Sequence, residues 1–320
     1  MKKFLFIIDP IAYLDPTHDS SVAMMESAQI LGHEVYITTI DKLSVVKGQA
    51  YGHITPVTLK PVQLVEGKWV AEREWYQVGE AFFTSLEFCD VVLMRKDPPV
   101  TTAYLYATYI LDLVNPQKTK VVNSPQGIRG ANEKMYALQF TEVIPETIVT
   151  QSKEVIAEFL EAKKALILKP LGGKAGEGIL YLQEGDRNFN SLIEISTKQG
   201  QEPIMVQEYL PSAKEGDKRI ILLGGKPIGA VNRIPTGKEF RGNMAVGGRV
   251  ANTEITPREL EICEAIAPTL LRDGLVFVGI DVIGGYLTEI NVTSPTGIRE
   301  IDRLSGVNLG KDAIEYFLFP

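Results

Sequence analysis

The chain has 320 residues, of which 33 are Lys or Arg and 40 are Asp or Glu, so its formal net charge is −7. Hydrophobic residues at 45% and charged residues at 23% are typical of a globular protein with two or three domains, and they exclude disordered, collagen-like and disulfide-scaffold proteins. The acidic balance argues against a nucleic-acid partner, and no apolar run reaches the roughly 18 residues of a membrane span.

The first part of the chain alternates between strand and helix patterns. Its strands are continuous apolar runs, which is typical of a sheet covered on both faces. We predict strands at Lys3–Ile8, Glu34–Thr39, Val91–Met94 and Lys120–Val122, helices from Asp19 or Ser20 to Leu31 and over Thr102–Leu113, and a hairpin over Val57–Val70 broken at 66–68. This β-α-β order indicates an open α/β domain over residues 1–122.

From about residue 123 the pattern changes to shorter strands. We predict strands of an antiparallel sheet at Ala165–Lys169, Ile179–Leu182, Ile204–Gln207, Arg219–Leu223 and Lys226–Asn232, a loop at Ile234–Arg249, a hairpin over Val276–Val292 and a helix over Leu309–Phe317. Another helix begins at Thr256, because a Thr cap is followed by Pro at the first position and Glu at the third.

Two features bear on where the protein works. The apolar run that follows Met1-Lys2-Lys3 ends after five residues at Asp9-Pro10, which is too short for a signal peptide and indicates a buried strand. Cys89 and Cys263 belong to no CxxC motif and to no Cys/His cluster, so we expect two buried thiols in a reducing compartment. The expected location is the cytoplasm.

A glycine-rich segment lies between two predicted strands. Residues 172–178 contain four glycines, so the backbone there can turn N–H groups toward an anion. A Walker A loop needs Gly-Lys-Ser/Thr before a helix, whereas here Lys174 precedes Ala175 and a strand. The segment is therefore either a lid over phosphates or a flexible hairpin tip. Lys169, at the end of the preceding strand, favours the lid because its ammonium can neutralise a phosphate.

Three polar side chains interrupt the otherwise apolar hairpin near the C-terminus. Glu289 and Asn291 are two residues apart and share one face. A plain two-residue turn at Gly284-Gly285 places Asp281 on the opposite face, whereas a three-residue loop or one bulge pairs Asp281 with Glu289. In that register three oxygen-bearing groups converge, as a Mg²⁺ site requires. The alternative is a polar outer face of the sheet.

Basic side chains occur on strand ends and in polar segments of the same region. They are Lys134, Lys169, Arg219, Arg233, Arg241, Arg249 and Arg299. A solvated charge is the ordinary explanation for an arginine on a strand. Phosphoryl transfer, however, needs cations that absorb the developing charge. Together with the glycines and the acidic hairpin, these residues favour a nucleotide-using enzyme.

Several runs of the sequence resemble the prokaryotic glutathione synthetase family. The runs are Asp9–Ile11, Asp19–Ser21, Met94–Pro99, Asn132–Lys134, Lys169–Leu171, Gly242–Arg249 and Thr288–Glu300. The similarity covers essentially the whole chain. The Glu-x-Asn element at 289–291 is shared by ATP-grasp ligases generally, whereas the Arg-Lys-Asp-Pro-Pro run is more specific to this family.

The resemblance implies an N-terminal α/β domain that precedes a two-subdomain ATP-grasp fold, with subdomains over about 123–208 and 209–320. It implies ligation of γ-glutamylcysteine and glycine at the expense of ATP, through an acyl phosphate, to give glutathione, ADP and phosphate. It also implies two Mg²⁺ ions, with Mn²⁺ as a substitute, and a homotetramer. No protein nucleophile is needed, so we expect no catalytic role for His18, His33 or His53.

The same resemblance assigns roles to residues of this chain. Those implied to contact ATP are Lys134, Lys169, Gly173, Lys174, Gly176, Gly178, Gln207, Glu208, Tyr209 and Leu210. Arg219 and Arg233 are implied to stabilise the phosphates and the acyl phosphate, and Asp281, Glu289 and Asn291 to bind the metal ions. Those implied for the other substrates are Asp19, Ser20, Arg95, Asp97, Arg241, Ser294 and Arg299. The loop at 234–249 is implied to close over the intermediate.

Two alternatives remain open at the level of sequence. One is an ATP-grasp ligase for another carboxylate and amine, such as a D-alanine–D-alanine or glutamate ligase. Its substrate specificity would be set partly by Asp19, Ser20, Arg95 and Asp97. The other is a non-catalytic ATP-binding protein. Against it stands the joint presence of the acidic trio with Arg219 and Arg233, which pure binding does not require.

Overall fold

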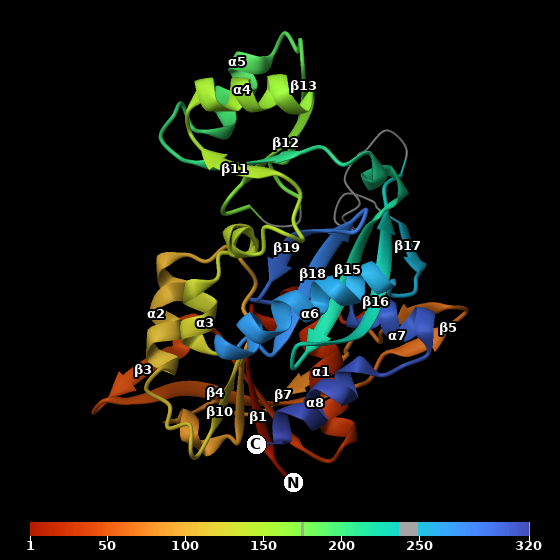
Figure 1. Ribbon diagram of the computed structural model, residues 1–320. Coiled ribbons are helices and arrows are strands. Elements are labelled where there is room, and N and C mark those ends of the chain that lie inside the picture. The colour runs from red at the N-terminus through yellow and green to blue at the C-terminus, as the bar shows by residue number, and fades with distance from the viewer. Residues whose placement is uncertain (174–175, 237–248, 320) are drawn as a thin grey trace.

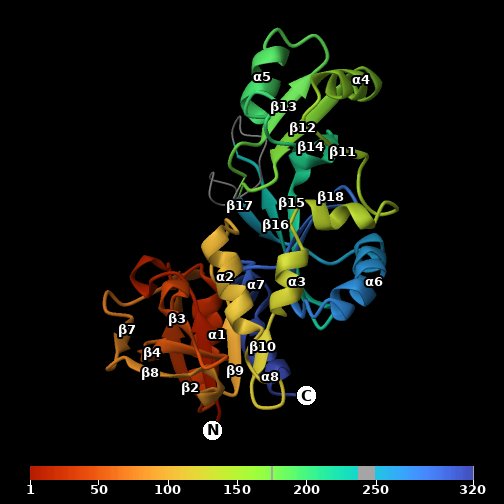
Figure 2. The same ribbon diagram turned by 90° about the vertical axis from the view of Figure 1, so that its left-hand side faces the viewer.

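The computed structural model describes residues 1–173, 176–236 and 249–319, which form three sheets and one two-stranded ribbon (Figure 1). The four-stranded sheet lies at one end of the molecule, the five-stranded sheet in the middle and the eight-stranded N-terminal sheet at the other end (Figures 1 and 2). The arrangement agrees with the predicted class, an open α/β unit followed by two α+β units.

The N-terminal sheet has parallel strands at its centre and antiparallel strands at one edge. Its order is β10-β9-β1-β2-β4-β3, and β7 and β8 both pair with β4. The strands are β1 (Lys3–Ile7), β2 (Glu34–Thr38), β3 (Leu43–Val46), β4 (Gln49–Leu59), β7 (Tyr76–Val78), β8 (Phe82–Ser85), β9 (Val91–Met94) and β10 (Lys120–Val122). The four strands predicted from apolar runs are confirmed, and β1, β2, β9 and β10 pair in parallel.

The predicted hairpin over Val57–Val70 is wrong in its first strand. Val57–Leu59 is the end of β4 and pairs with β7, whereas the hairpin consists of β5 (Gln63–Val65) and β6 (Lys68–Val70) alone. Val57 and Leu59 are buried in the core, and their partner strand lies well downstream in the sequence. A local pattern does not reveal such a non-local pairing.

Three helices belong to the N-terminal part: α1 (Ser20–Ile30), α2 (Thr102–Leu111) and α3 (Pro125–Gly130). Asp19 caps α1, because its Oδ1 accepts a hydrogen bond from the backbone N–H of Val22 at 2.9 Å. This cap confirms the predicted helix start. Short 3₁₀ turns connect the elements here and later in the chain: Ile11–Tyr13, Ile40–Lys42, Leu86–Phe88, Met135–Gln139 and Pro211–Glu215.

The four-stranded sheet is a separate antiparallel unit with the order β11-β14-β12-β13. Its elements are β11 (Thr147–Thr150), α4 (Lys153–Lys163), β12 (Ala165–Pro170), β13 (Leu180–Gln183), α5 (Phe189–Ser196) and β14 (Ile204–Glu208). Both helices were missing from the sequence prediction. One face of α4 and α5 packs on the sheet through Ile156, Leu160 and Ile193. The N-terminus of α4 is marked by Ser152, which caps the helix at Val155 N.

The five-stranded sheet is antiparallel, with the order β17-β16-β15-β18-β19. Its strands are β15 (Asp217–Leu223), β16 (Lys226–Ile234), β17 (Arg249–Asn252), β18 (Phe277–Ile283) and β19 (Tyr286–Asn291), and its helices are α6 (Pro257–Arg272), α7 (Ile298–Ser305) and α8 (Leu309–Leu318). Thr256 and Glu259 form the predicted capping box of α6. The prediction contained α8 but not α7. Of the predicted loop at 234–249, residues 237–248 lie outside the described residues.

The five-stranded sheet and the N-terminal sheet share two apolar cores. One core joins Leu5 and Val92 to Leu222 and Ile280, and the other joins Phe6 and Leu93 to residues of β15 and α8. Asn123 ties the two units further, because its side chain bonds to the backbone of Val276, Phe277 and Val292 at 2.8–2.9 Å. These two units therefore form one packed body.

We propose domain boundaries near residues 122 and 208. The last strand of the N-terminal sheet ends at Val122, and the last strand of the four-stranded sheet ends at Glu208. The C-terminal helix α8 nevertheless packs against α1, since Ser27 Oγ donates to Asn308 Oδ1 at 3.3 Å. Among the described residues no helix is long and apolar enough to cross a membrane.

Candidate functional site

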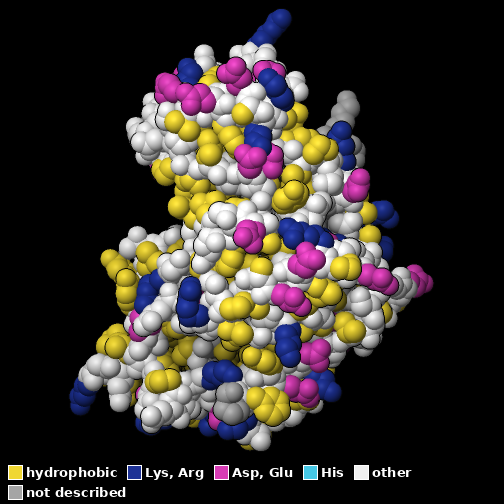
Figure 3. Space-filling model, in the orientation of Figure 1, with side chains coloured by type: hydrophobic (Ala, Val, Ile, Leu, Met, Phe, Trp, Pro, Cys, Tyr) yellow, Lys and Arg dark blue, Asp and Glu magenta, His cyan; other side chains and the backbone are white. Residues whose placement is uncertain are grey.

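A cavity of about 420 Å³ lies where the three sheets meet. Its walls come from the segment after β1, from the central strands β12 and β14 of the four-stranded sheet and from β15, β18 and β19 of the five-stranded sheet. In the space-filling view the four-stranded unit is set off from the body by an indentation, and acidic and basic side chains are interspersed over that face (Figure 3). Other acidic and basic side chains line the cavity itself, and these are the candidates for a functional role.

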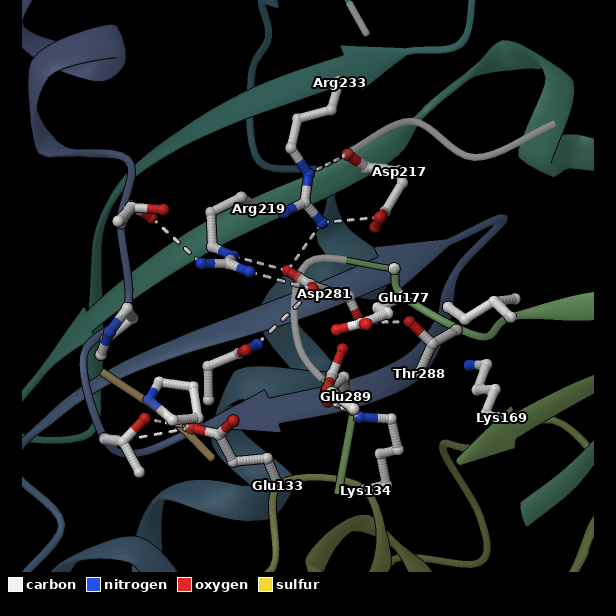
Figure 4. A pocket seen from close by; sticks show the side chains of 18 of the residues that line it. Glu133, Lys134, Lys169, Glu177, Asp217, Arg219, Arg233, Asp281, Thr288 and Glu289 are labelled. Carbon is white, nitrogen blue, oxygen red and sulfur yellow. Dashed lines mark hydrogen bonds and ion pairs between the residues drawn. The ribbon is translucent and has the colours of Figure 1, made fainter. Parts of the chain in front are cut away.

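Two arginines converge on Asp281 in the middle of the five-stranded sheet (Figure 4). Arg219 lies directly across from Asp281 in the sheet register, and its Nε and Nη2 donate to the two carboxylate oxygens at 2.5 and 3.1 Å. Arg233 Nη2 reaches Asp281 Oδ1 at 2.9 Å. Burial alone raises the pKa of Asp281, but the two guanidinium groups outweigh it and hold the pKa well below the usual range. Asp281 is therefore ionised.

A glycine makes this approach possible. Arg219 crosses β18 at Gly279, where an added Cβ would stand 3.2 Å from Arg219 Cδ and 2.7 Å from the Cβ of Pro295. A side chain at this position would push the guanidinium away from Asp281. In the sequence Gly279-Ile280-Asp281, the glycine thus leaves room for the Arg219 side chain, and the aspartate accepts its hydrogen bonds.

Asp217 is a member of this network that the sequence prediction missed. Its Oδ2 accepts from Arg233 Nη2 at 2.6 Å, whereas its Oδ1 is buried and has no hydrogen-bond partner among the described residues. Burial raises the pKa of Asp217, and Arg233 acts in the opposite direction. Its place two residues before Arg219 on the same strand face was the signal available in the sequence.

Of the two registers that the sequence leaves open for the acidic hairpin, the structure has the one that pairs Asp281 with Glu289. The turn is the two-residue Gly284-Gly285, and a bulge at Thr288 shifts the pairing so that Asp281 lies across from Glu289 and Gly279 across from Asn291. The bulge also explains why Leu287 and Ile290, three residues apart, are both buried in the same core. The amide of Asn291 lies 3.5 Å from Asp281 Oδ2.

These oxygens fit a hard divalent cation. Asp281, Glu289 and Asn291 present carboxylate and amide oxygens on one face of the hairpin, which is the ligand chemistry of Mg²⁺. Among the described residues no group of three His, Cys, Asp or Glu side chains is placed to hold a metal, so the third protein oxygen would be the amide of Asn291. Both oxygens of Asp281 already accept from arginine, and a bound metal would share them.

Two lysines reach the cavity from different elements (Figure 4). Lys134 Nζ contacts Glu289 Oε1 at 3.1 Å and the carbonyl oxygen of Gly173 at 2.8 Å. Lys169 comes from β12 and donates to Gln207 Oε1 at 2.6 Å. Burial lowers the pKa of Lys169, although the carboxylate of Glu289 acts in the opposite direction.

The predicted ATP-contacting segments line the cavity in part. Gln207, Glu208, Tyr209 and Leu210 follow one another along its wall, as do Gly173 and Gly176 in the glycine-rich segment. Gly178 packs against Pro170 beside the cavity, with φ +70°. Lys174, predicted to contact ATP, and Arg241, predicted to contact substrate, both lie outside the described residues.

The predicted substrate residues divide into two groups. Asp19, Asp97 and Ser294 line the cavity, whereas Ser20, Arg95 and Arg299 are absent from its wall in the described part of the chain. These last three are buried behind the wall, and their role as substrate contacts stays a prediction. Arg95 donates to Pro295 O at 3.1 Å and to Ser21 Oγ at 3.0 Å.

Ser20 and Arg299, like Arg95, bind to other groups of the protein. Ser20 Oγ accepts from the N–H of Ile298 at 3.3 Å, and Arg299 pairs with the buried Glu26 at 2.7 Å. These hydrogen bonds and ion pairs to neighbouring protein groups stabilise the wall of the cavity from behind. The sequence motif located the right region but not the direction of each side chain.

Glu133 and His18 are two further cavity residues to which the sequence prediction gave no role. Glu133 Oε1 accepts from the N–H groups of Val292 and Thr293 and from Thr293 Oγ1, which fixes the chain just after β19. Glu133 lies next to the predicted Lys134, and that adjacency was the available signal. His18, expected to be an ordinary loop residue, lies in the wall of the cavity and contacts Glu300.

Comparisons with known proteins match nearly the whole length of the chain. Residues 2–129 match the family model "Prokaryotic glutathione synthetase, N-terminal domain", and residues 133–306 match "Prokaryotic glutathione synthetase, ATP-grasp domain". The glutathione synthetase of Nostoc sp. is 65% identical over 98% of this chain and 97% of its own length. That of Mesorhizobium japonicum is 41% identical over 96% of each chain.

Solved structures resemble the fold at much lower identity. The ATP-grasp ligase PsnB complexed with a minimal precursor superimposes with a TM-score of 0.65 at 16% identity, covering 99% of each chain. The D-cycloserine synthetase DcsG has a TM-score of 0.64 at 12% identity, covering 98% of each chain. These likenesses establish the fold alone.

Proposed function

The chain belongs to the prokaryotic glutathione synthetase family, and we propose that the cavity where its three sheets meet holds ATP, γ-glutamylcysteine and glycine together. The enzyme is an ATP-dependent carboxylate–amine ligase that joins γ-L-glutamyl-L-cysteine to glycine through an acyl phosphate and releases glutathione, ADP and phosphate. The observation that carries this function is 65% identity over nearly the full length to curated glutathione synthetases.

The chemistry needs activation of a poor electrophile. The cysteinyl carboxylate attacks the γ-phosphorus of ATP, ADP leaves, and the resulting acyl phosphate is attacked by the neutral amine of glycine, so that phosphate leaves. Arg219 and Arg233 supply buried positive charge where the transferred phosphoryl oxygens would lie. An acyl phosphate hydrolyses in water, so the intermediate has to be kept from solvent until glycine attacks it.

We assign the cofactor-binding roles by unit. The wall from the four-stranded sheet holds ATP, with Lys169 and Lys134 on its phosphates and Gln207–Leu210 along its base and ribose. The glycine-rich segment closes on the phosphates through Gly173 and Gly176, and Lys174 adds a cation. The opposite wall, with Asp19 and Asp97, receives γ-glutamylcysteine, and Ser294 lies on the side of glycine.

ATP-grasp ligases use a divalent metal, and we propose that it is Mg²⁺, two ions held by Asp281, Glu289 and Asn291, with Mn²⁺ as a substitute. When bound, these ions neutralise the phosphate oxygens of ATP. The two arginines keep Asp281 ionised, which a ligand carboxylate requires. By family resemblance we also propose a cytoplasmic homotetramer.

An isotope experiment tests the acyl-phosphate route directly. γ-Glutamylcysteine labelled with heavy oxygen in its cysteinyl carboxylate should pass one labelled oxygen to phosphate for each glutathione formed, because the bridging oxygen leaves with phosphorus. Glycine labelled in its carboxylate is the matched control and should pass none. Unlabelled phosphate from labelled γ-glutamylcysteine would contradict the route.

The metal assignment predicts a large loss on changing one side chain. Glu289→Gln keeps the shape of the side chain but removes its charge, so turnover should fall by about 100-fold or more, with the midpoint of Mg²⁺ dependence moved to higher concentration. Glu261→Gln, on the exposed face of α6, is the control for the same chemical change. Turnover near the parent level at low Mg²⁺ would contradict Glu289 as a ligand.

A further inference from the structure

The segment between β1 and α1 folds into a tight turn in the wall of the cavity. The Asp15 carboxylate accepts from the N–H of Thr17 at 2.9 Å and from its hydroxyl at 2.7 Å, and Asp15 O accepts from the N–H of Asp19 at 2.8 Å. Asp15, His18 and Asp19 all line the cavity. The turn therefore presents its side chains to the substrate space as a preformed unit.

Helix α7 holds this turn from behind at two points. Arg299 Nε donates to the carbonyl oxygen of Pro16 at 3.0 Å, and His18 Nδ1 lies 2.6 Å from Glu300 Oε1. Helix α7 follows directly after Ser294–Thr296, which line the same cavity, and it also contacts α1 (Figures 1 and 2). The two contacts thus join two walls of the cavity that are far apart in the sequence.

The two contacts differ in chemistry. Arg299 is a permanent cation, buried beside Glu26 and packed over the ring of Trp69 at 5.5 Å. The His18–Glu300 contact is titratable: the Glu300 side chain is 9% exposed and the His18 side chain 38%. The Oε2 atom of Glu300 is buried and has no hydrogen-bond partner among the described residues, so His18 is the polar partner that this carboxylate has.

We propose that His18 is a positioning residue that fixes the 15–19 turn against α7 through Glu300 and thereby shapes the wall that receives γ-glutamylcysteine. The inference rests on the proposed function, and it adds a residue that neither binds ATP nor takes part in the phosphoryl transfer. The acids that face His18 are Glu300 on α7 and Asp15 and Asp19 in its own turn.

The charge on the imidazole sets how strong the contact is. The hydrogen bond from His18 to Glu300 raises the pKa of His18 above its ordinary 6.5, against the opposing effect of burial. The charge on His18 therefore stabilises the contact below the unfolded-state pKa of 6.5, and this stabilisation is lost as the pH rises through the folded-state pKa of His18. A neutral imidazole with its proton on Nδ1 still donates, but more weakly.

Steady-state kinetics of the parent and two variants test this role. His18→Lys keeps a permanent cation, and His18→Gln keeps only a neutral donor. We expect His18→Gln to raise the KM for γ-glutamylcysteine about 5- to 10-fold at about pH 6.5, with the KM for ATP and kcat nearly unchanged. The KM of the parent should match that of His18→Lys at the acidic end of the range and move toward that of His18→Gln at the alkaline end. Titration of the substrates affects the three proteins equally, so it cancels when the KM values are compared as ratios at the same pH.

NMR titration provides a measurement that does not depend on turnover. The chain has three histidines, His18, His33 and His53, so the ring resonances are few enough to assign by substitution. His18 should titrate above His33, whose pKa is lowered by burial. In Glu300→Gln the pKa of His18 should fall, because the carboxylate that stabilises the imidazolium is gone.

The outcomes separate this inference from the function on which it rests. If the parent makes glutathione and His18→Gln leaves the KM for γ-glutamylcysteine unchanged, the inference is wrong and the function stands. An unchanged pKa of His18 in Glu300→Gln also overturns it. If the parent makes no glutathione, both are overturned.

Discussion

The four-stranded and five-stranded sheets contribute side chains to the same cavity, but they are anchored in the molecule differently. The four-stranded sheet packs on α4 and α5 around its own small core, which includes Leu168 and Val206. The five-stranded sheet shares both of its cores with the N-terminal sheet. One sheet is thus a separate unit, and the other is part of a larger body.

This difference indicates that the two sheets contribute to the cavity in different ways. The body fixes the charges that we propose to act on the transferred phosphoryl group, because Arg219, Arg233 and Asp281 are buried on strands that cannot shift without opening the cores. Lys169 and Gln207 stand on the separate unit. A rigid-body movement of that unit would change the distance between Lys169 and Glu289 while leaving each core intact.

The largest effect is expected on removing the carboxylate that both arginines share in the body. Asp281→Ala leaves Arg219 and Arg233 buried without their common carboxylate, and we expect a loss of about 3–5 kcal/mol in the free energy of unfolding. Urea unfolding followed by circular dichroism measures it. Glu261→Ala, which removes an exposed partner of Arg258, should change the value by less than about 0.5 kcal/mol. An unfolding midpoint of Asp281→Ala equal to the parent value would contradict a structural role for the network.

A matched pair of cavity-forming substitutions tests whether the two sheets unfold separately. Ile280→Ala and Leu168→Ala each remove a fully buried side chain, and each should cost about 2–5 kcal/mol locally. The two variants should differ in which backbone amides exchange faster. In Ile280→Ala, hydrogen exchange should become faster across the N-terminal and five-stranded sheets. In Leu168→Ala, it should become faster only within residues 147–208. Faster exchange in β1 and β9 of Leu168→Ala would show that the four-stranded sheet is not a separate unit.

A smaller effect is expected at the edge of the body. Thr256→Ala removes the side chain that caps α6 at Glu259 N, and we expect a loss of about 0.5–2 kcal/mol without a change in KM for any substrate. Thr256→Ser should restore most of the stability, because the hydroxyl remains. Thermal unfolding of the three proteins decides between these outcomes, and equal midpoints would contradict the role of the cap.

The sequence predicted elements best where local chemistry decides the structure. The capping box at Thr256, the cap at Asp19 and the Gly284-Gly285 turn were all visible in the residues themselves. The second strand of the Val57–Val70 hairpin was predicted correctly, but Val57–Leu59 pairs with a distant strand that no local pattern identifies. Helices α4 and α7 were missed although both are amphipathic.

The site shows the same limit at the level of side chains. The choice between opposite-face and same-face registers for Asp281 and Glu289 depended on a bulge at Thr288, which packing of Leu287 and Ile290 selects. Arg95 and Arg299 occur in the motifs as predicted, yet both turn into the protein to hold backbone and buried charge. Sequence motifs locate the region of a site, whereas burial and hydrogen bonding decide which side chains face the substrate.

The most direct test of the central claim is phosphate release from ATP and Mg²⁺ with γ-glutamylcysteine and glycine both present and with each omitted in turn. We predict release that requires both substrates, with glutathione formed in equal amount. Release that is supported only by another pair of carboxylate and amine, with no glutathione formed, would contradict the account while leaving the fold unchanged.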